Sequence, residues 1–407
     1  MHLRGIFLCA ALHWHYALPS FTYVNFNDTS ALRLNGDAAT SACGDGGPYL
    51  YSAVHGVNDG LDTGGQPGEA LAEGAATRTV TASLPFGAAA SAEAARLLAG
   101  FPSRDAFGAS PDNSTGPCPL RLRLTPSRAF KAASALRLQA LPVLGGWETG
   151  FTFQLTDPSR QCTQVKDATF GAASHRACTV AGGDGLAFVL HGDPRAGSAA
   201  LGGGGGGLGY AGLPAALAVE FDTWYNAEGG GGVEGSGDLP YDHVTVQAAP
   251  VGGPSARAAS DTPYVTSGTL TRISGPPLRR DLGDGQLHTV RIAYYPYLKM
   301  DLVQRFVGAD SLAQHLTAQA ERQRIGTLAV WVDEREAGTG QVAGAAPGAA
   351  GSGTLLPTLA LPLNLFSVLR PEGGAAWAGF TASTGSTAWQ KHDILQWYWC
   401  DAVGCSA

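Results

Sequence analysis

The sequence predicts an all-β fold in which antiparallel sheets pack into a sandwich. Short runs of alternating apolar and polar residues recur along the chain, and Gly, Pro and Asp separate them, as is typical of strands joined by turns. Regular helices do not intervene between these runs, which argues against the strand–helix alternation of a parallel sheet. Eight Trp and fifteen Phe residues supply the bulk for a hydrophobic core.

Ten segments carry the strand pattern, and the first three alternate along their whole length. In order, we expect strands over residues 21–26, 135–138, 150–155, 185–190, 219–225, 243–247, 289–294, 327–332, 377–382 and 394–399. Three other segments are interpreted as insertions on the folded core. Residues 84–118 are rich in Ala and Pro and predict a short helix over 88–98, residues 297–324 predict one amphipathic helix, and residues 337–353 predict a flexible Gly/Ala-rich loop.

The composition limits the classes of function. At 407 residues the chain is long enough for one large domain or two ordinary ones. Charged residues make up only 14%, and the 57 Gly residues gather in patches, which indicates loops on a folded core rather than overall disorder. The net charge of −7 gives no electrostatic reason to expect nucleic acid as a partner. No run of 18 apolar residues occurs, so we expect no membrane span.

The amino terminus resembles a secretion signal over residues 1–20. Arg4 precedes a short apolar stretch, and Ala17 lies close to other small residues, as at a cleavage site. Two Asn-x-Ser/Thr triplets, at Asn27 and Asn113, are compatible with export and glycosylation. We therefore expect a secreted or extracellular protein, in the cell wall, the matrix or the secretory pathway.

The cysteine count agrees with an oxidising compartment. Removal of the signal would take Cys9 and leave six cysteines, an even number. Six cysteines allow fifteen pairings. We expect Cys162–Cys178 and Cys400–Cys405, because these two pairs close short loops, and the second pair lies in a short carboxy-terminal tail of residues 400–407.

One segment combines core and polar residues in strict alternation: residues 219–226 read Val-Glu-Phe-Asp-Thr-Trp-Tyr-Asn. On a strand, one face carries Val219, Phe221, Thr223 and Tyr225, and the other carries Glu220, Asp222, Trp224 and Asn226. The two carboxylates on the second face lie roughly 6.6–7 Å apart along the strand. Such carboxylates must be solvated, paired with cations or bound to a metal.

The residues that follow favour a metal. A glycine-rich gap leads to Asp238, and His243 opens the next strand, so both can return to the carboxylates of the first strand. Carboxylate, amide and carbonyl oxygens suit calcium, and an added imidazole suits a transition ion such as manganese. Asp242 is an alternative to Asp238 as a ligand, with Asp238 preferred.

This segment resembles the metal loop of the legume-type (L-type) lectins, which have the concanavalin A-like sandwich. Four further landmarks of that family occur in the same order: residues 21–26 with 34–38, residues 183–188, residues 202–209, and residues 379–385 with 394–397. The resemblance covers about residues 21–399 apart from the insertions. It implies a single lectin domain with a jelly-roll β-sandwich of antiparallel sheets.

The resemblance also assigns roles to residues. It implies manganese held by Glu220, Asp222, Asp238 and His243, and calcium held by Asp222, the carbonyl of Trp224, Asn226 and Asp238. It implies a cis peptide bond between Gly183 and Asp184. It further implies a sugar site in which Asp184 and Asn226 bond hydroxyl groups, Trp224 packs under the ring, the backbone of Gly206 donates, and Ser386 and Thr387 belong to a variable specificity loop.

The resulting expectation is a metal-dependent lectin that binds glycans or glycoproteins without catalysis. One alternative is a polysaccharide-cleaving glycoside hydrolase of the same sandwich, which would use Glu-x-Asp-x-x-Glu. Here Tyr225 follows in place of the third carboxylate. Another alternative is a structural or adhesion sandwich that has lost sugar binding, although Asp184 and Asn226 are both present. Both a monomer and an oligomer stay open.

Overall fold

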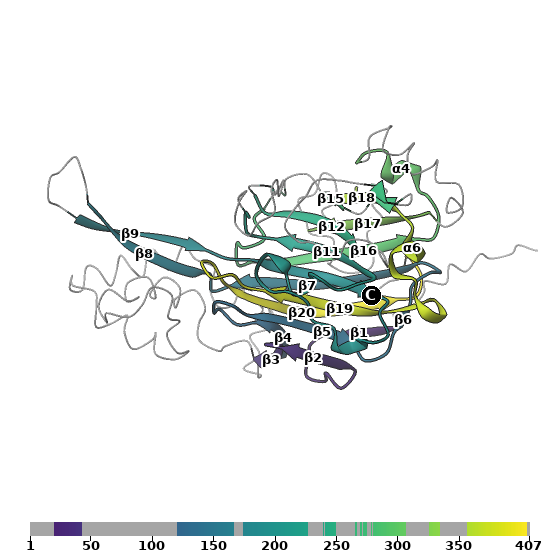
Figure 1. Cartoon of the computed structure of the whole chain (residues 1–407), viewed down its shortest axis with the longest axis horizontal. Coiled ribbons are helices and arrows are strands. Elements are labelled where there is room, and N and C mark those ends of the chain that lie inside the picture. Colours follow the sequence, from purple (N-terminus) through teal and green to yellow (C-terminus); the bar gives the residue numbers. More distant parts are fainter. Residues whose placement is uncertain are drawn as a thin grey trace, which may run out of the picture.

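The computed structural model of the chain describes residues 20–42, 120–166, 174–226, 239, 241–249, 265–266, 269–270, 272–274, 278, 280–306, 325–333 and 356–404. Two antiparallel sheets dominate this part of the chain and stack into a sandwich (Figure 1). The all-β sandwich predicted from the sequence is therefore confirmed. The expected signal up to residue 19, the insertions at 84–118 and 337–353, and residues 405–407 lie outside the described residues.

One sheet, called here the β7 sheet, has eight strands. Its order is β18 (Leu359–Leu363), β17 (Gly326–Val332), β16 (Leu287–Tyr295), β7 (Trp147–Thr156), β20 (Lys391–Cys400), β4 (Leu120–Thr125) and β3 (Ala39–Ala42), and β1 (Phe21–Tyr23) pairs with β20.

The second sheet, called here the β10 sheet, also has eight strands and carries the candidate site. Its order is β15 (Arg272–Ser274), β12 (His243–Ala249), β11 (Ala216–Asp222), β10 (Gly185–His191), β19 (Ala375–Ser383), β5 (Ala132–Arg137) and β2 (Leu32–Gly36), and β6 (Leu141–Pro142) pairs with β19.

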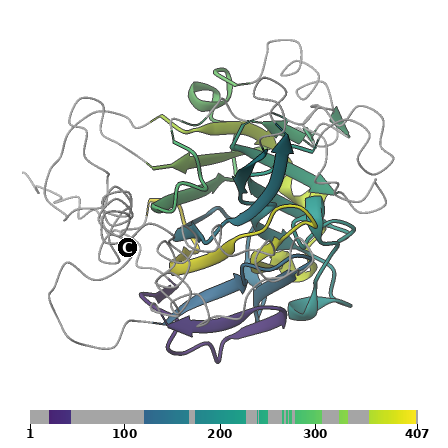
Figure 2. The ribbon, with the colours of Figure 1, turned by 90° about the vertical axis from the view of Figure 1, so that its left-hand side faces the viewer.

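Smaller elements complete the described structure. Strands β8 (Ser159–Lys166) and β9 (Ser174–Ala181) form a hairpin that projects from one end of the sandwich, the end that faces the viewer in Figure 2. Strands β13 (Val265–Thr266) and β14 (Thr269–Leu270) form a second two-stranded sheet. The helices are short: α4 (Met300–Val303), α6 (Leu365–Leu369) and the 3-10 turns η2 (Gly197–Ala199), η3 (Gly205–Gly207) and η5 (Glu372–Gly374).

The main core lies between the two sheets. Because side chains alternate along a strand, Phe151 of β7 faces the opposite sheet, where it meets the ring of Phe380 edge-on at 4.9 Å and that of Phe221 at 5.7 Å. Val219 and Phe221 belong to this core, as their alternation predicted. Full burial of each such side chain contributes roughly 1.5–3 kcal/mol, so the aromatic layer is a major part of what holds the sheets together.

Each of the ten predicted segments overlaps a strand, but the bounds differ: the strand expected over 21–26 ends at Tyr23, and the one expected over 135–138 covers 132–137. Strand β11 ends at Asp222, and Tyr225, expected on the core face, is 48% exposed. In β20 the register shifts between Ile394 and Gln396, which is a bulge. The bulge lets Ile394 and Trp397 both reach the core although they are three residues apart.

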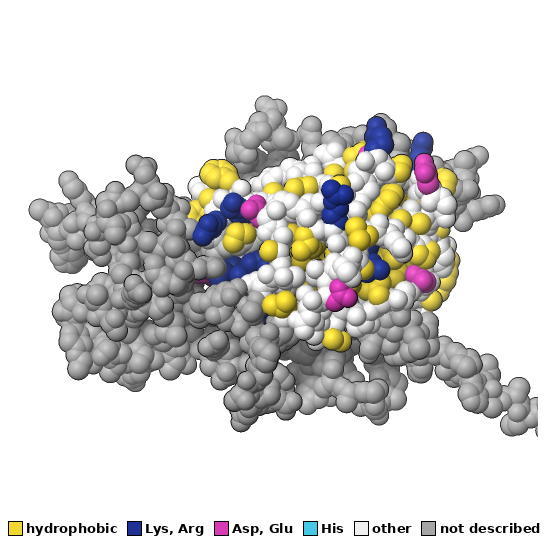
Figure 3. Space-filling view, turned by 90° about the horizontal axis from the view of Figure 1, so that it is seen from below, with side chains coloured by type: hydrophobic (Ala, Val, Ile, Leu, Met, Phe, Trp, Pro, Cys, Tyr) yellow, Lys and Arg dark blue, Asp and Glu magenta, His cyan; other side chains and the backbone are white. Residues whose placement is uncertain are grey.

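The predicted amphipathic helix, membrane-spanning helices and the surface charge can be checked in the described residues. The described part of the insertion at 297–324 contains the four-residue helix α4, and residues 307–324 lie outside the description. Among the described residues, no helix has the length and apolar character of a membrane span. On the face seen in Figure 3, charged side chains of both signs are scattered among polar and hydrophobic ones, without a patch of one sign.

Candidate functional site

Four chain segments meet at one end of the β10 sheet. Gly185, which opens β10, pairs with Asp222 at the end of β11 and with Ser383 at the end of β19. Asp222 in turn pairs with His243, which opens β12. The antiparallel register therefore brings the segments before β10 and β12 beside those that follow β11 and β19.

Asp184 lies at the centre of this end. Its peptide bond with Gly183 is cis, as the resemblance implied. Its backbone N–H donates to the carbonyl of Ser383 (3.0 Å), and its own carbonyl accepts from the N–H (3.0 Å) and the hydroxyl (3.1 Å) of Thr223. Three hydrogen bonds thus hold the main chain of Asp184 between β11 and β19.

The carboxylate of Asp184 is buried but not satisfied. The residue is 4% exposed, and its Oδ2 has no hydrogen-bond partner among the described residues. Burial raises the pKa of Asp184 to about 7, because the charged form loses hydration without a compensating donor. Such a group is a strong acceptor for any hydroxyl that reaches it.

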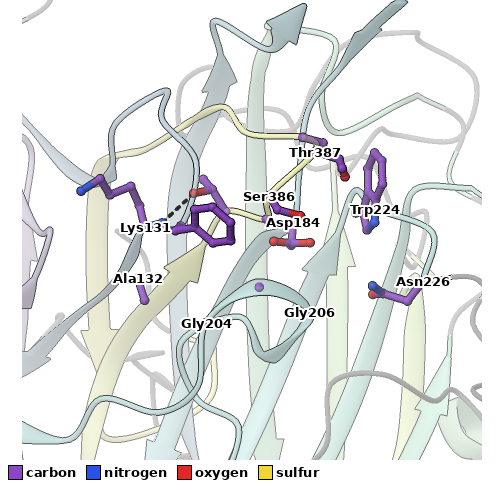
Figure 4. Close-up of a pocket in the computed structure, with 14 residues that line it drawn as sticks. Lys131, Ala132, Asp184, Gly204, Gly206, Trp224, Asn226, Ser386 and Thr387 are labelled. Atoms are coloured by element: carbon purple, nitrogen blue, oxygen red, sulfur yellow. Dashed lines mark hydrogen bonds between the residues drawn. The ribbon is translucent and has the colours of Figure 1, made fainter. Parts of the chain in front are cut away.

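This carboxylate faces a cavity of about 540 Å³ (Figure 4). The six residues predicted for sugar binding all line this cavity, namely Asp184, Gly206, Trp224, Asn226, Ser386 and Thr387. In Figure 4, Trp224 and Asn226 lie on one side of Asp184, and Lys131 lies on the other. The structure therefore brings the predicted residues together from four separate segments of the chain.

The glycine loop forms the third wall. Gly204, Gly205 and Gly206 line the cavity at the turn η3, and the hydroxyl of Ser383 donates to the carbonyl of Gly205 (2.6 Å). A Cβ atom at Gly206 would lie 3.0 Å from Oδ1 of Asn226, so a larger residue would crowd that amide. The close approach of backbone and amide explains glycine at this position.

Trp224 packs directly on the turn that carries Asp184. A Cβ atom at Gly183 would lie 3.3 Å from Cβ of Trp224 and 3.4 Å from its ring. The backbone N–H of Trp224 donates to Oδ1 of Asp222 (2.8 Å), so the end of β11 also fixes the start of this loop. Because β11 stops at Asp222, Trp224 and Asn226 reach the cavity from a loop and not from a strand face.

The described residues partly fit the implied metal set. Asp222 lies opposite His243 in the register, and the two residues are 4% and 1% exposed. Nδ1 of His243 lies 2.8 Å from the carbonyl of Tyr241, which can only accept, so Nδ1 carries the proton and Nε2 the lone pair. This is the tautomer of a metal-binding histidine with its outer partner in place.

Glu220 has other partners in the structure. The hydroxyl of Tyr210 donates to one oxygen of its carboxylate, and the amide of Gln247 donates to the other (2.9 Å). Glu220 is fully buried. It thereby ties β11 to Tyr210, which follows the glycine loop, and both oxygens of its carboxylate accept hydrogen bonds.

The remaining candidate ligands divide into two cases. Asp242 accepts hydrogen bonds from the backbone N–H groups of Leu282 (2.7 Å) and Gly283 (3.2 Å). Burial raises the pKa of Asp242, and it outweighs these two hydrogen bonds, which lower it. Asp242 is thus engaged with a neighbouring turn. Asp238 lies outside the described residues, and among the described residues no group of three or more His, Cys, Asp or Glu side chains is arranged to hold a metal ion. A complete metal set would need Asp238.

Sequence reasoning missed one wall of the cavity. Phe130, Lys131 and Ala132, at the turn between β4 and β5, line it together with Thr384, Gly385 and Ala388. The turn carries no charge or glycine pattern that marks a binding site, so only its place beside the loop after β19 reveals it.

Comparison with known proteins gives structural likeness alone. No family model matches the chain, and no curated protein matches it. The solved lectin of Bauhinia forficata in complex with GalNAc is 17% identical, with 72% of this chain and 89% of that chain covered and a TM-score of 0.37.

Two further solved structures are similar at the same level. Lectin I-B4 of Griffonia simplicifolia, in its metal-free form, is 19% identical and covers 69% of this chain and 86% of its own, with a TM-score of 0.37. The exoplasmic/lumenal domain of VIP36, in its Ca²⁺/Man2-bound form, is 14% identical, covers 70% and 78%, and has a TM-score of 0.38. At this level the likeness does not bear on what the chain binds. The two-sheet sandwich and the cis peptide bond before Asp184 agree with the fold that the L-type lectin resemblance implies.

Proposed function

We propose that the chain is a calcium-dependent carbohydrate-binding protein that binds glycans or glycoproteins and catalyses no reaction. The observation that carries this proposal is the carboxylate of Asp184, whose buried Oδ2 lacks a hydrogen-bond partner among the described residues and faces a shared cavity. Vicinal sugar hydroxyls are donors of the right kind and spacing for such a carboxylate. Each hydrogen bond to a charged acceptor contributes roughly 1.5–3 kcal/mol.

The other walls of the cavity suit the same ligand. The amide of Asn226 can bond a further hydroxyl, and the backbone at Gly206 lies close enough for its N–H to donate. Trp224 offers an apolar face for the C–H side of a sugar ring. Ser386 and Thr387 are exposed at the rim, where they would select among sugars.

The ion that we expect is calcium, held by Asp222, Asn226, Asp238 and the carbonyl of Trp224. A second ion such as manganese would use Asp222, Asp238 and His243, with Glu220 as the fourth ligand. Bound cations would supply fixed positive charge beneath the cavity. The tautomer of His243 supports this set, whereas the bonds from Tyr210 and Gln247 compete for Glu220.

The hydrolase is the less favoured candidate. Cleavage of a glycosidic bond ordinarily needs two carboxyl groups at the bond, about 5–5.5 Å or 6.5–9.5 Å apart. Among the described residues that line the cavity, Asp184 is the one carboxylate. Glu220, which a hydrolase would need, is fully buried, and its carboxylate accepts hydrogen bonds from Tyr210 and Gln247.

We also propose a secretory or extracellular location. Cys400 is disulfide-bonded, and its expected partner Cys405 lies outside the described residues. Cys162 and Cys178 stand directly opposite each other in the register of β8 and β9. Both observations support the two expected pairs and an oxidising compartment.

A glycan screen tests the proposal. The purified chain is applied to an array of glycans in calcium, in EDTA, and in EDTA followed by excess calcium. We expect binding to a related group of glycans that EDTA removes and calcium restores. Absence of binding in calcium, or binding that EDTA leaves unchanged, would contradict a calcium-dependent lectin.

A further inference from the structure

An exposed aromatic side chain stands at the wall of the cavity that sequence reasoning missed. Phe130 is 78% exposed, although most large apolar residues of the described chain are buried. Its φ is 58°, in the left-handed region that bulky residues rarely adopt. The chain therefore holds a large apolar ring in solvent, in an unfavourable backbone conformation, at the edge of the proposed sugar site.

Hydrogen bonds fix this conformation against the loop after β19. The N–H of Phe130 donates to the carbonyl of Gly385 (3.1 Å). The next residue, Lys131, exchanges two bonds with Thr384: its N–H donates to the hydroxyl (2.9 Å), and its carbonyl accepts from the N–H (2.9 Å). The hydroxyl of Thr384 donates to the carbonyl of Arg128 (2.6 Å), which closes the turn.

The same loop contacts Asp184. A Cβ atom at Gly385 would lie 3.2 Å and 3.3 Å from the two oxygens of the Asp184 carboxylate. The position of Phe130 is thus set relative to the carboxylate through one shared segment. Because Trp224 and Asn226 lie on the opposite side of Asp184 from Lys131 (Figure 4), the turn at 130–131 extends the cavity away from the first aromatic contact.

The charge at this wall is neutralised. Nζ of Lys131 lies 3.2 Å from Oδ1 of Asp37, and both side chains are about one third exposed, at 31% and 33%. The carboxylate of Asp37 beside Lys131 and the carboxylate of Asp184 in the cavity both repel a sulfate or carboxylate group on a ligand. An apolar ring beside a paired cation therefore favours an uncharged ligand.

We propose that Phe130 is the contact for a second sugar ring, so that the ligand is a neutral oligosaccharide of at least two residues. This inference rests on the proposed function, because the first ring is the one bound at Asp184. The cavity of about 540 Å³ lies within the roughly 300–1,000 Å³ of sites for drug-sized ligands, a size that suits a di- or trisaccharide.

The test measures the gain in affinity with chain length. Mannose, galactose and N-acetylglucosamine are titrated by calorimetry in calcium, each as the free sugar and as its disaccharide and trisaccharide. Covering one face of a Phe ring removes about 50 Å² of apolar surface from water, a quarter of the roughly 200 Å² that an aromatic residue buries. At roughly 25 cal/mol per Å², the disaccharide of a sugar that binds should bind about tenfold tighter than the free sugar through this contact.

Four variants separate the ring from the backbone. Phe130→Ala should abolish the gain with chain length and leave the free sugar unchanged. Phe130→Trp should keep the gain. Phe130→Gly should also lose it, yet melt no lower than the wild type, because glycine relieves the left-handed strain. The matched control is Phe366→Ala in α6, at a partly exposed Phe that does not line the cavity. It should change neither the affinity for the free sugar nor the gain in affinity with chain length.

The outcomes distinguish this inference from the proposed function. If none of these sugars binds and the glycan array in calcium also shows no binding, the proposed function fails and the inference falls with it. If a free sugar binds but its disaccharide and trisaccharide bind no tighter, the inference alone is wrong. It is equally wrong if Phe130→Ala retains the full gain.

Discussion

Replacement of Asp184 by Asn should weaken sugar binding and, at the same time, stabilise the fold. Asn has nearly the same size as Asp, but it replaces one acceptor oxygen with a donor amide and removes the charge. The carboxylate is 4% exposed, and its Oδ2 has no partner among the described residues. In the free protein the Asp184 carboxylate loses its hydrogen bonds to water and gains none at Oδ2 from the described residues. A ligand hydroxyl that donates to it would replace them.

The structure sets the size of both effects. Loss of the charged acceptor should weaken sugar binding by about 1.5–3 kcal/mol, which is roughly ten- to hundredfold in Kd. An unsatisfied buried polar group costs about 1–3 kcal/mol, and a charged one costs more. The amide of Asn is also polar and keeps part of this cost, so Asp184→Asn removes only the excess that the charge adds; it should raise the free energy of unfolding in calcium-free protein by roughly 1–3 kcal/mol. At about 2–4 °C per kcal/mol for a domain of this class, the change in Tm is measurable.

Calorimetric titration with a sugar found in the glycan screen measures the first effect, and thermal unfolding in EDTA measures the second. EDTA matters because the charge of a bound ion would offset that of the carboxylate. Asp28→Asn, at an exposed turn where the carboxylate accepts from Ser30, is the control and should alter neither quantity. If Asp184→Asn bound sugar as tightly as the wild type, the sugar would lie elsewhere. A lower Tm in EDTA would refute the claim that the carboxylate is an uncompensated buried charge.

Four other predictions concern metal, sugar, catalysis and pH. Asp222→Asn should weaken calcium and sugar binding together in calorimetric titrations, and excess calcium should partly restore both; loss of sugar binding alone would contradict its role as a ligand. Trp224→Ala should weaken sugar binding through lost apolar contact while calcium still raises Tm, since only its carbonyl is assigned to the ion. The chain should release no reducing ends from β-glucans; turnover that disappears in Glu220→Gln would favour the hydrolase instead. Burial disfavours the charged form of His288, but hydrogen bonds and charges of Asp284 and Asp333 outweigh it and raise its pKa to about 9. Its stabilisation is therefore complete below the unfolded pKa of about 6.5 and is lost as pH rises toward 9, so denaturant unfolding should show a decline over that window that His288→Asn removes.

The sequence was sufficient for the strands because their apolar periodicity reflects burial directly. In β11, Val219 and Phe221 face the core between the sheets, as alternation predicted. Every residue of β10 and β11 is nevertheless buried, because the alternate positions belong to a second apolar cluster that contains Ala187, Val189, Ala216 and Ala218. The sugar-site candidates came from the resemblance, and the structure brings them to one cavity because the register aligns Gly185 with both Asp222 and Ser383.

Contacts between distant segments were not predictable in this way. Tyr210 donates to Glu220 from a loop ten residues earlier, which no local pattern in β11 reveals. Phe130 belongs to a turn whose exposure depends on its bonds to residues 384 and 385. Side chains on one face of a regular strand are two residues apart, but the bulge in β20 puts Ile394 and Trp397, three residues apart, on the same face. A strict alternation therefore cannot predict both as core residues.

A series of hydrogen bonds between polar side chains holds the backbone of Asp184 in place without a bound ligand. The hydroxyl of Thr223 donates to the carbonyl of Asp184, which can only accept, so Thr223 must in turn accept the bond from the amide of Gln390 (3.0 Å).

The donors and acceptors of the remaining hydrogen bonds follow, because the carbonyl of Asp184 can only accept. The amide of Gln390 also donates to Nε2 of His392 (3.4 Å), so the proton of His392 is on Nδ1, where it is shared with the hydroxyl of Thr125 (2.5 Å). Burial lowers the pKa of His392 to about 3, which keeps the ring neutral and able to accept. Since Thr125 and His392 belong to the β7 sheet, and Asp184 immediately precedes β10, this series of hydrogen bonds links the two sheets. A charged His392 would have no acceptor nitrogen, and the bond from Gln390 would be lost. The neutral histidine is therefore what allows the opposite sheet to support the backbone of Asp184, the carboxylate proposed to bind sugar.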